Sequence, residues 1–230
     1  MAGRIIVITG AFGALGSAVA AAAHEQGARL ALIDFAKDPR PGLPSGADVL
    51  VRAGVDLTDA NQAGAAIDAA ADRFGGLDAL LNIAGGFAWE KVEGGSTATW
   101  YDLYRLNVLT ASNASRAAIP HLKRSSAGRI VNVGANAALK ASLGMGAYAA
   151  SKAGVHALTQ ALAEELKSDD VTVNAVLPSI IDTPANRAEM PKADASAWVA
   201  PADLAAVMLF LASEAATAVT GALIPVTGRV

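Results

Sequence analysis

A β-branched run that leads directly into a glycine-rich turn constrains the fold of this chain more than any other feature. The run Arg4–Thr9 has the nearly continuous apolar pattern of a strand buried on both faces of a parallel sheet. The turn Gly10–Gly16 follows at once, and an alanine-rich stretch to about Gln26 has the composition of a helix. Glycines in this context let the backbone approach a ligand, while N–H groups at the helix start can receive a pyrophosphate. The sequence therefore predicts a dinucleotide site at this turn.

The second strand-like run, which starts at Arg29, ends in Asp34, eighteen positions past the glycine turn. A carboxylate there can accept hydrogen bonds from both hydroxyls of an adenosine ribose and would repel a 2′-phosphate. NAD(H) is therefore favoured over NADP(H), and the alternative is an aspartate that caps a helix or faces solvent. The proline-rich stretch 38–46 predicts a loop in place of the next helix. NADP(H) stays open as a cofactor, because Lys37 and Arg40 in this loop can contact a phosphate.

Strand-like and helix-like segments alternate along the rest of the chain. Further strands are expected at residues 48–53, 77–83, 129–134, 171–177 and 222–226. Further helices are expected from an N-cap at Thr58 or Asp59 to about Phe74, and at residues 100–122, 147–166 and 201–213. The polar stretch 185–199 is expected to be irregular and to form a substrate loop at about 184–200. This alternation predicts an α/β doubly wound Rossmann fold, with a parallel seven-stranded sheet and helices on both faces.

Composition narrows the class of protein further. With 230 residues, 53% of them apolar, and no linker-like segment, the chain is expected to form a single domain, 1–230. It has no cysteine, and His24, His121 and His156 lack ligand spacing, so we expect structural or solvent-facing histidines and no metal site. The net charge of −3, with mixed signs, argues against a nucleic-acid partner. Because no apolar run spans a membrane and no signal peptide precedes the first strand, we expect a cytoplasmic protein.

Tyr148 and Lys152 are the strongest candidates for chemistry. They lie four positions apart in the expected helix 147–166, so their side chains project from one face. A fixed cation beside a phenol favours the phenolate and brings the tyrosine nearer the working range for proton transfer. The alternative is a packed tyrosine with a lysine that extends past it. Spacing alone does not decide between the two.

Several further segments resemble, in order and spacing, the short-chain dehydrogenase/reductase family over essentially the whole chain. They are the glycine turn after Thr9, Asp56, Asn82–Gly85, Asn107, the pair Tyr148 and Lys152, and Pro178–Thr183. The resemblance implies that Tyr148 donates or accepts a proton and that Lys152 binds the nicotinamide ribose and lowers the pKa of the tyrosine. It also implies that Asn107 holds a water in a proton relay.

The resemblance assigns cofactor contacts and a substrate pocket position by position. The implied cofactor-binding residues are Gly10, Phe12, Gly13, Leu15, Gly16, Asp34, Asp56, Leu57, Asn82, Ala84, Gly85, Tyr148, Lys152, Pro178, Ile181 and Thr183. The implied substrate-lining residues are Phe87, Trp89, Ala135, Met145, Ile180 and Trp198.

The chain departs from the family pattern at two positions. The second glycine of the turn is Gly13, and Ala14 occupies the position where most members have it. Ala135 stands thirteen residues before Tyr148, where the family carries a catalytic serine. Both departures are shared by the dihydropteridine reductase-like branch, which the segments 134–139 and 177–187 also resemble.

The expected function is hydride transfer between NAD(H) and a small carbonyl, alcohol or quinonoid substrate, with Tyr148 as proton donor or acceptor. Three alternatives stay open: a dihydropteridine reductase proper, a general carbonyl reductase or alcohol dehydrogenase, and a non-catalytic NAD-binding sensor or structural protein. The resemblance also implies a homodimer or homotetramer, built by pairing the helices that carry Asn107 and Tyr148.

Overall fold

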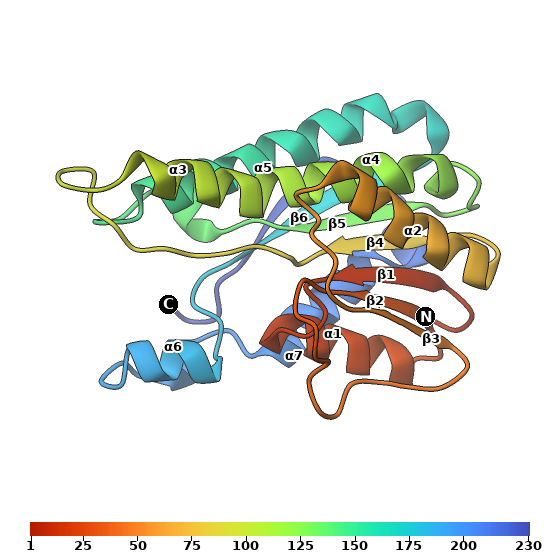
Figure 1. Cartoon of the computed structure of the whole chain (residues 1–230), viewed down its shortest axis with the longest axis horizontal. Helices are drawn as coiled ribbons and strands as arrows, with labels where there is room; N and C mark the ends of the chain where they lie inside the picture. Colours follow the sequence, from red (N-terminus) through yellow and green to blue (C-terminus); the bar gives the residue numbers. More distant parts are fainter.

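The structure, a computed structural model, describes all of residues 1–230 and is organised around one seven-stranded parallel sheet (Figure 1). The strands are β1 (Ile5–Thr9), β2 (Arg29–Ile33), β3 (Val49–Arg52), β4 (Ala79–Asn82), β5 (Arg129–Val133), β6 (Thr172–Pro178) and β7 (Leu223–Val226). Their order across the sheet is β3-β2-β1-β4-β5-β6-β7, so the predicted doubly wound fold is confirmed. The order reverses direction between β1 and β4, and in such sheets the ligand crevice lies outside the carboxyl ends of the strands at that point.

Helices cover both faces of the sheet, as predicted. On one face lie α1 (Ala14–Glu25) and α7 (Pro201–Leu211), and on the other lie α2 (Ala60–Phe74), α4 (Thr110–Leu122) and α5 (Gly146–Glu165) (Figure 1). Strand β1 shows why its sequence is apolar throughout. Ile6 and Ile8 are buried in the core against α1 and α7, whereas Ile5 and Val7 are buried in the core on the opposite face. Side chains alternate between faces along a strand, so a strand covered on both sides needs an unbroken apolar run.

The single long helix expected at 100–122 is wrong in detail. The structure has α3 (Thr97–Tyr104), one π-helical turn (Arg105–Leu109) and then α4. Helix α3 starts earlier than expected because Ser96 caps it, its hydroxyl oxygen accepting the Ala98 N–H at 3.1 Å. The π-helical turn carries Asn107, and turns of this kind are frequent at functional sites.

The irregular stretch expected at 185–199 is also wrong in part, because it contains the short helix α6 (Pro184–Glu189). Thr183 caps this helix through its hydroxyl oxygen, which accepts the Asn186 N–H at 3.2 Å, and Pro184 occupies the first helical position. The loop expected at 38–46 is confirmed. Asp59, one of the two expected N-caps, accepts the Asn61 N–H at 2.8 Å.

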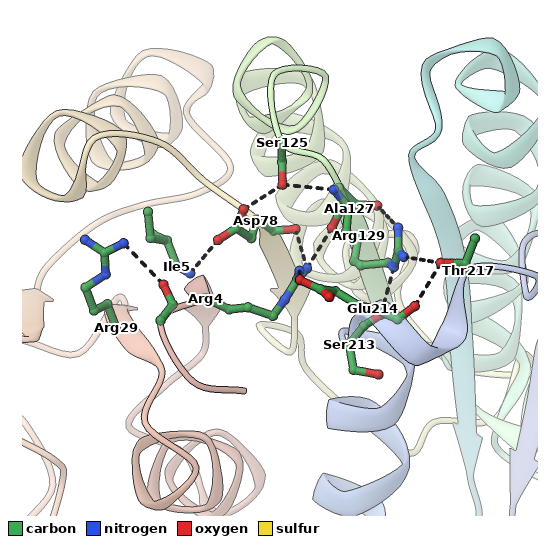
Figure 2. A network of polar contacts seen from close by, with 12 residues as sticks. Arg4, Ile5, Arg29, Asp78, Ser125, Ala127, Arg129, Ser213, Glu214 and Thr217 are labelled. Atoms are coloured by element: carbon green, nitrogen blue, oxygen red, sulfur yellow. Dashed lines mark hydrogen bonds and ion pairs between the residues drawn. The ribbon is translucent and has the colours of Figure 1, made fainter.

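A polar network ties the sheet together at the amino ends of its strands, opposite the crevice (Figure 2). Arg4 and Arg129 are buried there, and burial lowers the pKa of both. Arg129 donates to the Ser213 carbonyl oxygen at 3.0 Å, and Arg4 donates to the Ala127 carbonyl oxygen at 2.7 Å. These bonds anchor the starts of β1 and β5 to neighbouring loops at the edge of the sheet opposite the crevice. No helix is both long and apolar enough to cross a bilayer.

Candidate active site

A cleft of about 860 Å³ opens at the carboxyl ends of β1, β2 and β4, where the strand order reverses. The predicted cofactor residues that line it are Gly10, Phe12, Gly13, Leu15, Gly16, Asp34, Asp56, Leu57, Ala84, Gly85 and Thr183. Five other predicted cofactor residues are not among its walls: Asn82, Tyr148, Lys152, Pro178 and Ile181. The structure thus gathers eleven predicted contacts in one cleft from five separate loops.

The glycine turn fits a bound phosphate group. Gly10 has a φ of +64°, and a Cβ on it would lie 2.8 Å from the backbone of Ala84, while a Cβ on Gly16 would overlap the Gly10 carbonyl oxygen. These two glycines let α1 start close to the strand ends. Gly13 is exposed at the N-cap, and no side chain caps the N–H groups of the first turn of α1. A helix start with uncapped N–H groups at a cleft is a suitable anion site.

The Asp34 carboxylate makes hydrogen bonds to the backbone of the glycine turn and of its own loop. One carboxylate oxygen accepts the Phe12 N–H at 2.8 Å, and the other accepts the Ala36 N–H at 2.9 Å. Each oxygen has a second lone pair, so the carboxylate can still accept from a ligand hydroxyl. Lys37 and Arg40 do not line the cleft; Arg40 borders a separate hollow of about 350 Å³.

At the other side of the cleft, Asp56 and Thr58 form a small polar cluster. The Asp56 carboxylate accepts the Thr58 N–H at 2.9 Å and the Thr58 hydroxyl at 2.7 Å. Arg105, which the sequence analysis did not identify, lines the cleft from the π-helical turn and donates to Thr58 Oγ1 at 3.3 Å. No sequence pattern marks Arg105, because only the fold brings that turn to the end of β3.

Tyr148 and Lys152 lie in α5, beside the β4 end of the cleft. The Lys152 ammonium donates to the Val133 carbonyl oxygen at 2.8 Å, and a Cβ on Gly85 in the cleft wall would lie 3.4 Å from Nζ. Burial lowers the pKa of Lys152 to about 8 and raises the pKa of Tyr148 to about 12. Burial of the phenol is the cause of the shift at Tyr148, and the expected lowering of the tyrosine pKa by Lys152 stays a prediction.

The Asn107 side chain joins the cleft wall to α5. Its Oδ1 accepts the Gly86 N–H at 3.0 Å, and its Nδ2 donates to the Gly86 carbonyl oxygen at 3.0 Å and to Ser151 Oγ at 2.9 Å. The Ser151 hydroxyl in turn donates to the Tyr148 carbonyl oxygen at 2.8 Å. Both amide N–H groups are used in this way, so the side chain positions Gly86 and the Tyr148 turn, and the water that Asn107 is expected to hold stays a prediction.

Two predicted cofactor contacts make other bonds. The Asn82 amide is buried within the sheet layer and donates to Asn132 Oδ1 at 2.9 Å and to Ser115 Oγ at 3.0 Å. Ile181 pairs with Val199 in an isolated bridge. Pro178 is the last residue of β6, which leads toward Thr183 at the cleft.

Phe87 contacts Tyr148, and Trp89 lies two residues further along the same segment. The Phe87 and Tyr148 rings meet edge to face, with centroids 4.9 Å apart and planes at 76°. Trp89 packs against Gly144, whose φ of +73° and lack of a side chain admit the ring, and the Glu90 N–H donates to the Gly144 carbonyl oxygen at 2.8 Å. Phe87 and Trp89 remain 52% and 56% exposed, so both present apolar surface to an incoming molecule.

The other predicted substrate residues differ in their exposure. Met145 is half-buried at the N-cap of α5, and Ile180 is half-buried where its carbonyl oxygen accepts the Val199 N–H at 2.9 Å. Trp198 is buried, with its backbone against Gly228, so it packs within the C-terminal segment. Ala135 is 3% exposed, and no hydroxyl stands at that position.

Comparison with known proteins gives one consistent result. A sequence model described as short chain dehydrogenase matches residues 4–194. The chain is 32% identical to 2,5-dichloro-2,5-cyclohexadiene-1,4-diol dehydrogenase LinX of Sphingobium indicum, over 99% of this chain and 96% of that protein. It is 30% identical to 3-oxoacyl-[acyl-carrier-protein] reductase FabG of Thermotoga maritima, over 98% and 97%. A Brucella melitensis structure described as a short-chain dehydrogenase/reductase, glucose/ribitol dehydrogenase, superposes with a TM-score of 0.90 at 30% identity, covering 99% and 96%.

Proposed function

The chain belongs to the short-chain dehydrogenase/reductase family of oxidoreductases, and from that premise we propose that it moves a hydride between NAD(H) and a small carbonyl, alcohol or quinonoid substrate. Members of the family use nicotinamide cofactors, NAD(H) or NADP(H). The observation that carries the proposal is the position of Lys152. Its ammonium is buried beside Tyr148 and the cleft and has one hydrogen bond, although it can make three.

The residues of the cleft fit a nicotinamide dinucleotide, and each has a defined task. The start of α1 with Gly10, Gly13 and Gly16 receives the pyrophosphate, and Asp34 accepts hydrogen bonds from the adenosine ribose. NAD(H) is the proposed cofactor, because a carboxylate repels a 2′-phosphate and neither Lys37 nor Arg40 lines the cleft. When bound, the nicotinamide ring supplies or accepts the hydride.

Tyr148 exchanges the proton that accompanies the hydride. With its pKa raised to about 12, its phenol is protonated at neutral pH and is ready to donate to a substrate oxygen. The two unused N–H groups of Lys152 are available for ribose hydroxyls and for the phenol oxygen. Asn107 and Ser151 hold this turn of α5 in place.

The substrate is proposed to be a small, planar and largely apolar ring. Phe87 offers aromatic surface next to Tyr148, Trp89 offers more beside Gly144, and aromatic faces favour planar partners. Ala135 provides no hydroxyl to polarise a carbonyl, which favours an acceptor that is already electron-poor. The name of the Sphingobium relative also refers to a ring substrate, a cyclohexadiene diol.

A dihydropteridine reductase is the second candidate, because Ala135 and the segments 134–139 and 177–187 resemble that branch. A general carbonyl reductase or alcohol dehydrogenase, and a non-catalytic NAD-binding protein, are the remaining alternatives. A homodimer or homotetramer, a single domain over 1–230 and a cytoplasmic location complete the proposal.

The test is oxidation of NADH and NADPH by the purified protein with a quinonoid dihydropterin, a panel of cyclic enones and a panel of linear ketones. Reduction of NAD⁺ with cyclic diols covers the opposite direction. Turnover of ring substrates with NADH supports the proposal. Turnover of linear ketones alone supports the carbonyl reductase, and turnover of the pterin alone supports the dihydropteridine reductase. Binding of NADH without any turnover supports the non-catalytic alternative.

A further inference from the structure

Helix α5 makes two hydrogen bonds with the backbone at and just after the end of β5, and only one of them involves Lys152. The Lys152 ammonium donates to the Val133 carbonyl oxygen at 2.8 Å, and the Ala135 N–H donates to His156 Nε2 at 3.3 Å. Lys152 and His156 are one helical turn apart on the same face of α5. His156 was expected to be structural or solvent-facing, and at 6% exposed it is structural.

The backbone just after β5 leaves space for this imidazole. A Cβ on Gly134 would lie 2.5 Å from His156 Nε2 and 2.7 Å from Cδ2, so the ring occupies the space that a side chain at position 134 would fill. Leu177 of β6 closes the same space, 3.2 Å from that Cβ position. The His156 ring can therefore reach the Ala135 amide only because Gly134 has no side chain.

The hydrogen bond requires a neutral ring with its lone pair on Nε2. Burial and the charge of Lys152 both lower the pKa of His156, which favours that form. Lys152 is the charged group that acts on the ring from α5. The residues that face the ring from the segment just after β5 and from β6, namely Gly134, Ala135 and Leu177, carry no charge.

We propose that His156 is a positioning residue, whose neutral imidazole fixes the Ala135 amide and thereby sets the wall of the substrate pocket next to Tyr148. This inference rests on the proposed function, in which position 135 faces the reacting oxygen. Protonation of His156 replaces the acceptor with a second donor, so the ring can no longer hold the amide. It also places a second positive charge one turn from Lys152. The pocket wall is then released, and turnover falls at acid pH.

Two substitutions distinguish the effect of the hydrogen-bond acceptor at His156 from the effect of filling the space of its ring. In His156→Gln, the side-chain carbonyl oxygen can accept the Ala135 N–H and does not titrate, so kcat near pH 7.5 should stay within about threefold of wild type. The acid limb of its kcat profile should be absent. In His156→Leu, the amide is buried without an acceptor, and kcat should fall about tenfold, as a loss of about 1.4 kcal/mol implies. The NADH dissociation constant, measured by fluorescence, should be unchanged in both.

The Ala135 amide resonance in a ¹⁵N–¹H spectrum gives a readout that does not depend on activity or on the folding of a variant. In the wild type it should follow a single titration below pH 6.5, and in His156→Gln it should not respond. A wild-type resonance that is flat with pH overturns the inference, and so does an equal kcat for the Gln and Leu variants. If the wild type turns over no substrate, the proposed function fails, while the amide titration still decides the role of His156.

Discussion

The Lys152 ammonium donates to the Val133 carbonyl oxygen at 2.8 Å, and this is its one hydrogen bond within the chain. A buried ammonium that leaves two donors unused is costly, which is why burial lowers its pKa to about 8. Proteins retain such groups where a ligand completes the bonding. We interpret Lys152 as a group whose place in the structure serves binding and catalysis at the expense of stability.

The first prediction concerns pH. Lys152 is charged below its pKa of about 8 and neutral above it. The positive charge that is proposed to act on the Tyr148 phenol is therefore present at low pH and lost as pH rises. Because kcat/KM reports the free enzyme, its profile for substrate reduction should fall above pH 8. Steady-state NADH oxidation between pH 6 and 10 measures this. A profile that stays level to pH 9.5 would show that Lys152 does not govern the reaction.

The second prediction is that Lys152→Met stabilises the ligand-free protein while it removes activity. The lowered pKa means that the folded state holds this proton less tightly than the unfolded state, so below pH 8 the charge destabilises the fold. After subtraction of the lost Val133 bond, the gain should be roughly 1–2 kcal/mol at pH 7, or a few degrees in Tm.

Thermal unfolding at two pH values tests this reasoning. The wild-type protein gains stability as pH rises from about 8 toward 10.5, because its folded state has already released the proton. The advantage of Lys152→Met should therefore shrink at pH 10. A variant that is less stable than wild type by the same amount at both pH values contradicts the prediction.

The third prediction is that Asp34→Asn weakens NADH binding about tenfold, since one charge-assisted bond is worth about 1.5 kcal/mol or more. NADPH affinity should rise little, because Lys37 and Arg40 lie outside the cleft. Asp38→Asn is the matched control, since Asp38 is an exposed acid of the same loop. Fluorescence titrations of the wild type and both variants with both cofactors give the six dissociation constants. An equal loss in the control variant would remove Asp34 from the cofactor site.

Sequence patterns predicted the layers of this fold because burial dictates them. The unbroken apolar run of β1 follows from helices on both faces, and the spacing of Tyr148 and Lys152 follows from helical periodicity. The π-helical turn at Asn107 was not predictable from local sequence patterns. The Asn107 side chain is bonded to Gly86, which lies 21 residues away in the sequence.

Tertiary context also explains what the sequence alone did not predict. The pKa of Tyr148 depends on how deeply α5 packs, and the burial that raises it is not visible in a four-residue spacing. His156 stands one turn after Lys152, and Gly134 precedes Ala135, but nothing in the sequence says that the ring fills the space of the glycine. The start of α6 differs, because Thr183 followed by Pro184 is a local capping signal from which this helix could have been predicted.

The fourth prediction concerns the missing serine. Ala135→Ser adds a donor at a buried position just after β5, and for a linear ketone this extra hydrogen bond should raise kcat/KM about tenfold. For a quinonoid ring, which is already electron-poor, the change should be less than about threefold. Ala137→Ser, two residues further on, is the control for a general effect of a hydroxyl. Equal gains on both substrate classes would mean that Ala135 does not mark an electron-poor substrate.

The most direct test of the central claim is the activity of Tyr148→Phe. The phenyl ring keeps the edge-to-face contact with Phe87 and loses only the hydroxyl, so the fold and the cofactor cleft should be unaffected. We predict that kcat falls at least about a hundredfold, the lower range for loss of a general acid, while the NADH dissociation constant stays within about twofold. A variant that keeps most of its activity would contradict the assignment of Tyr148 as the proton donor.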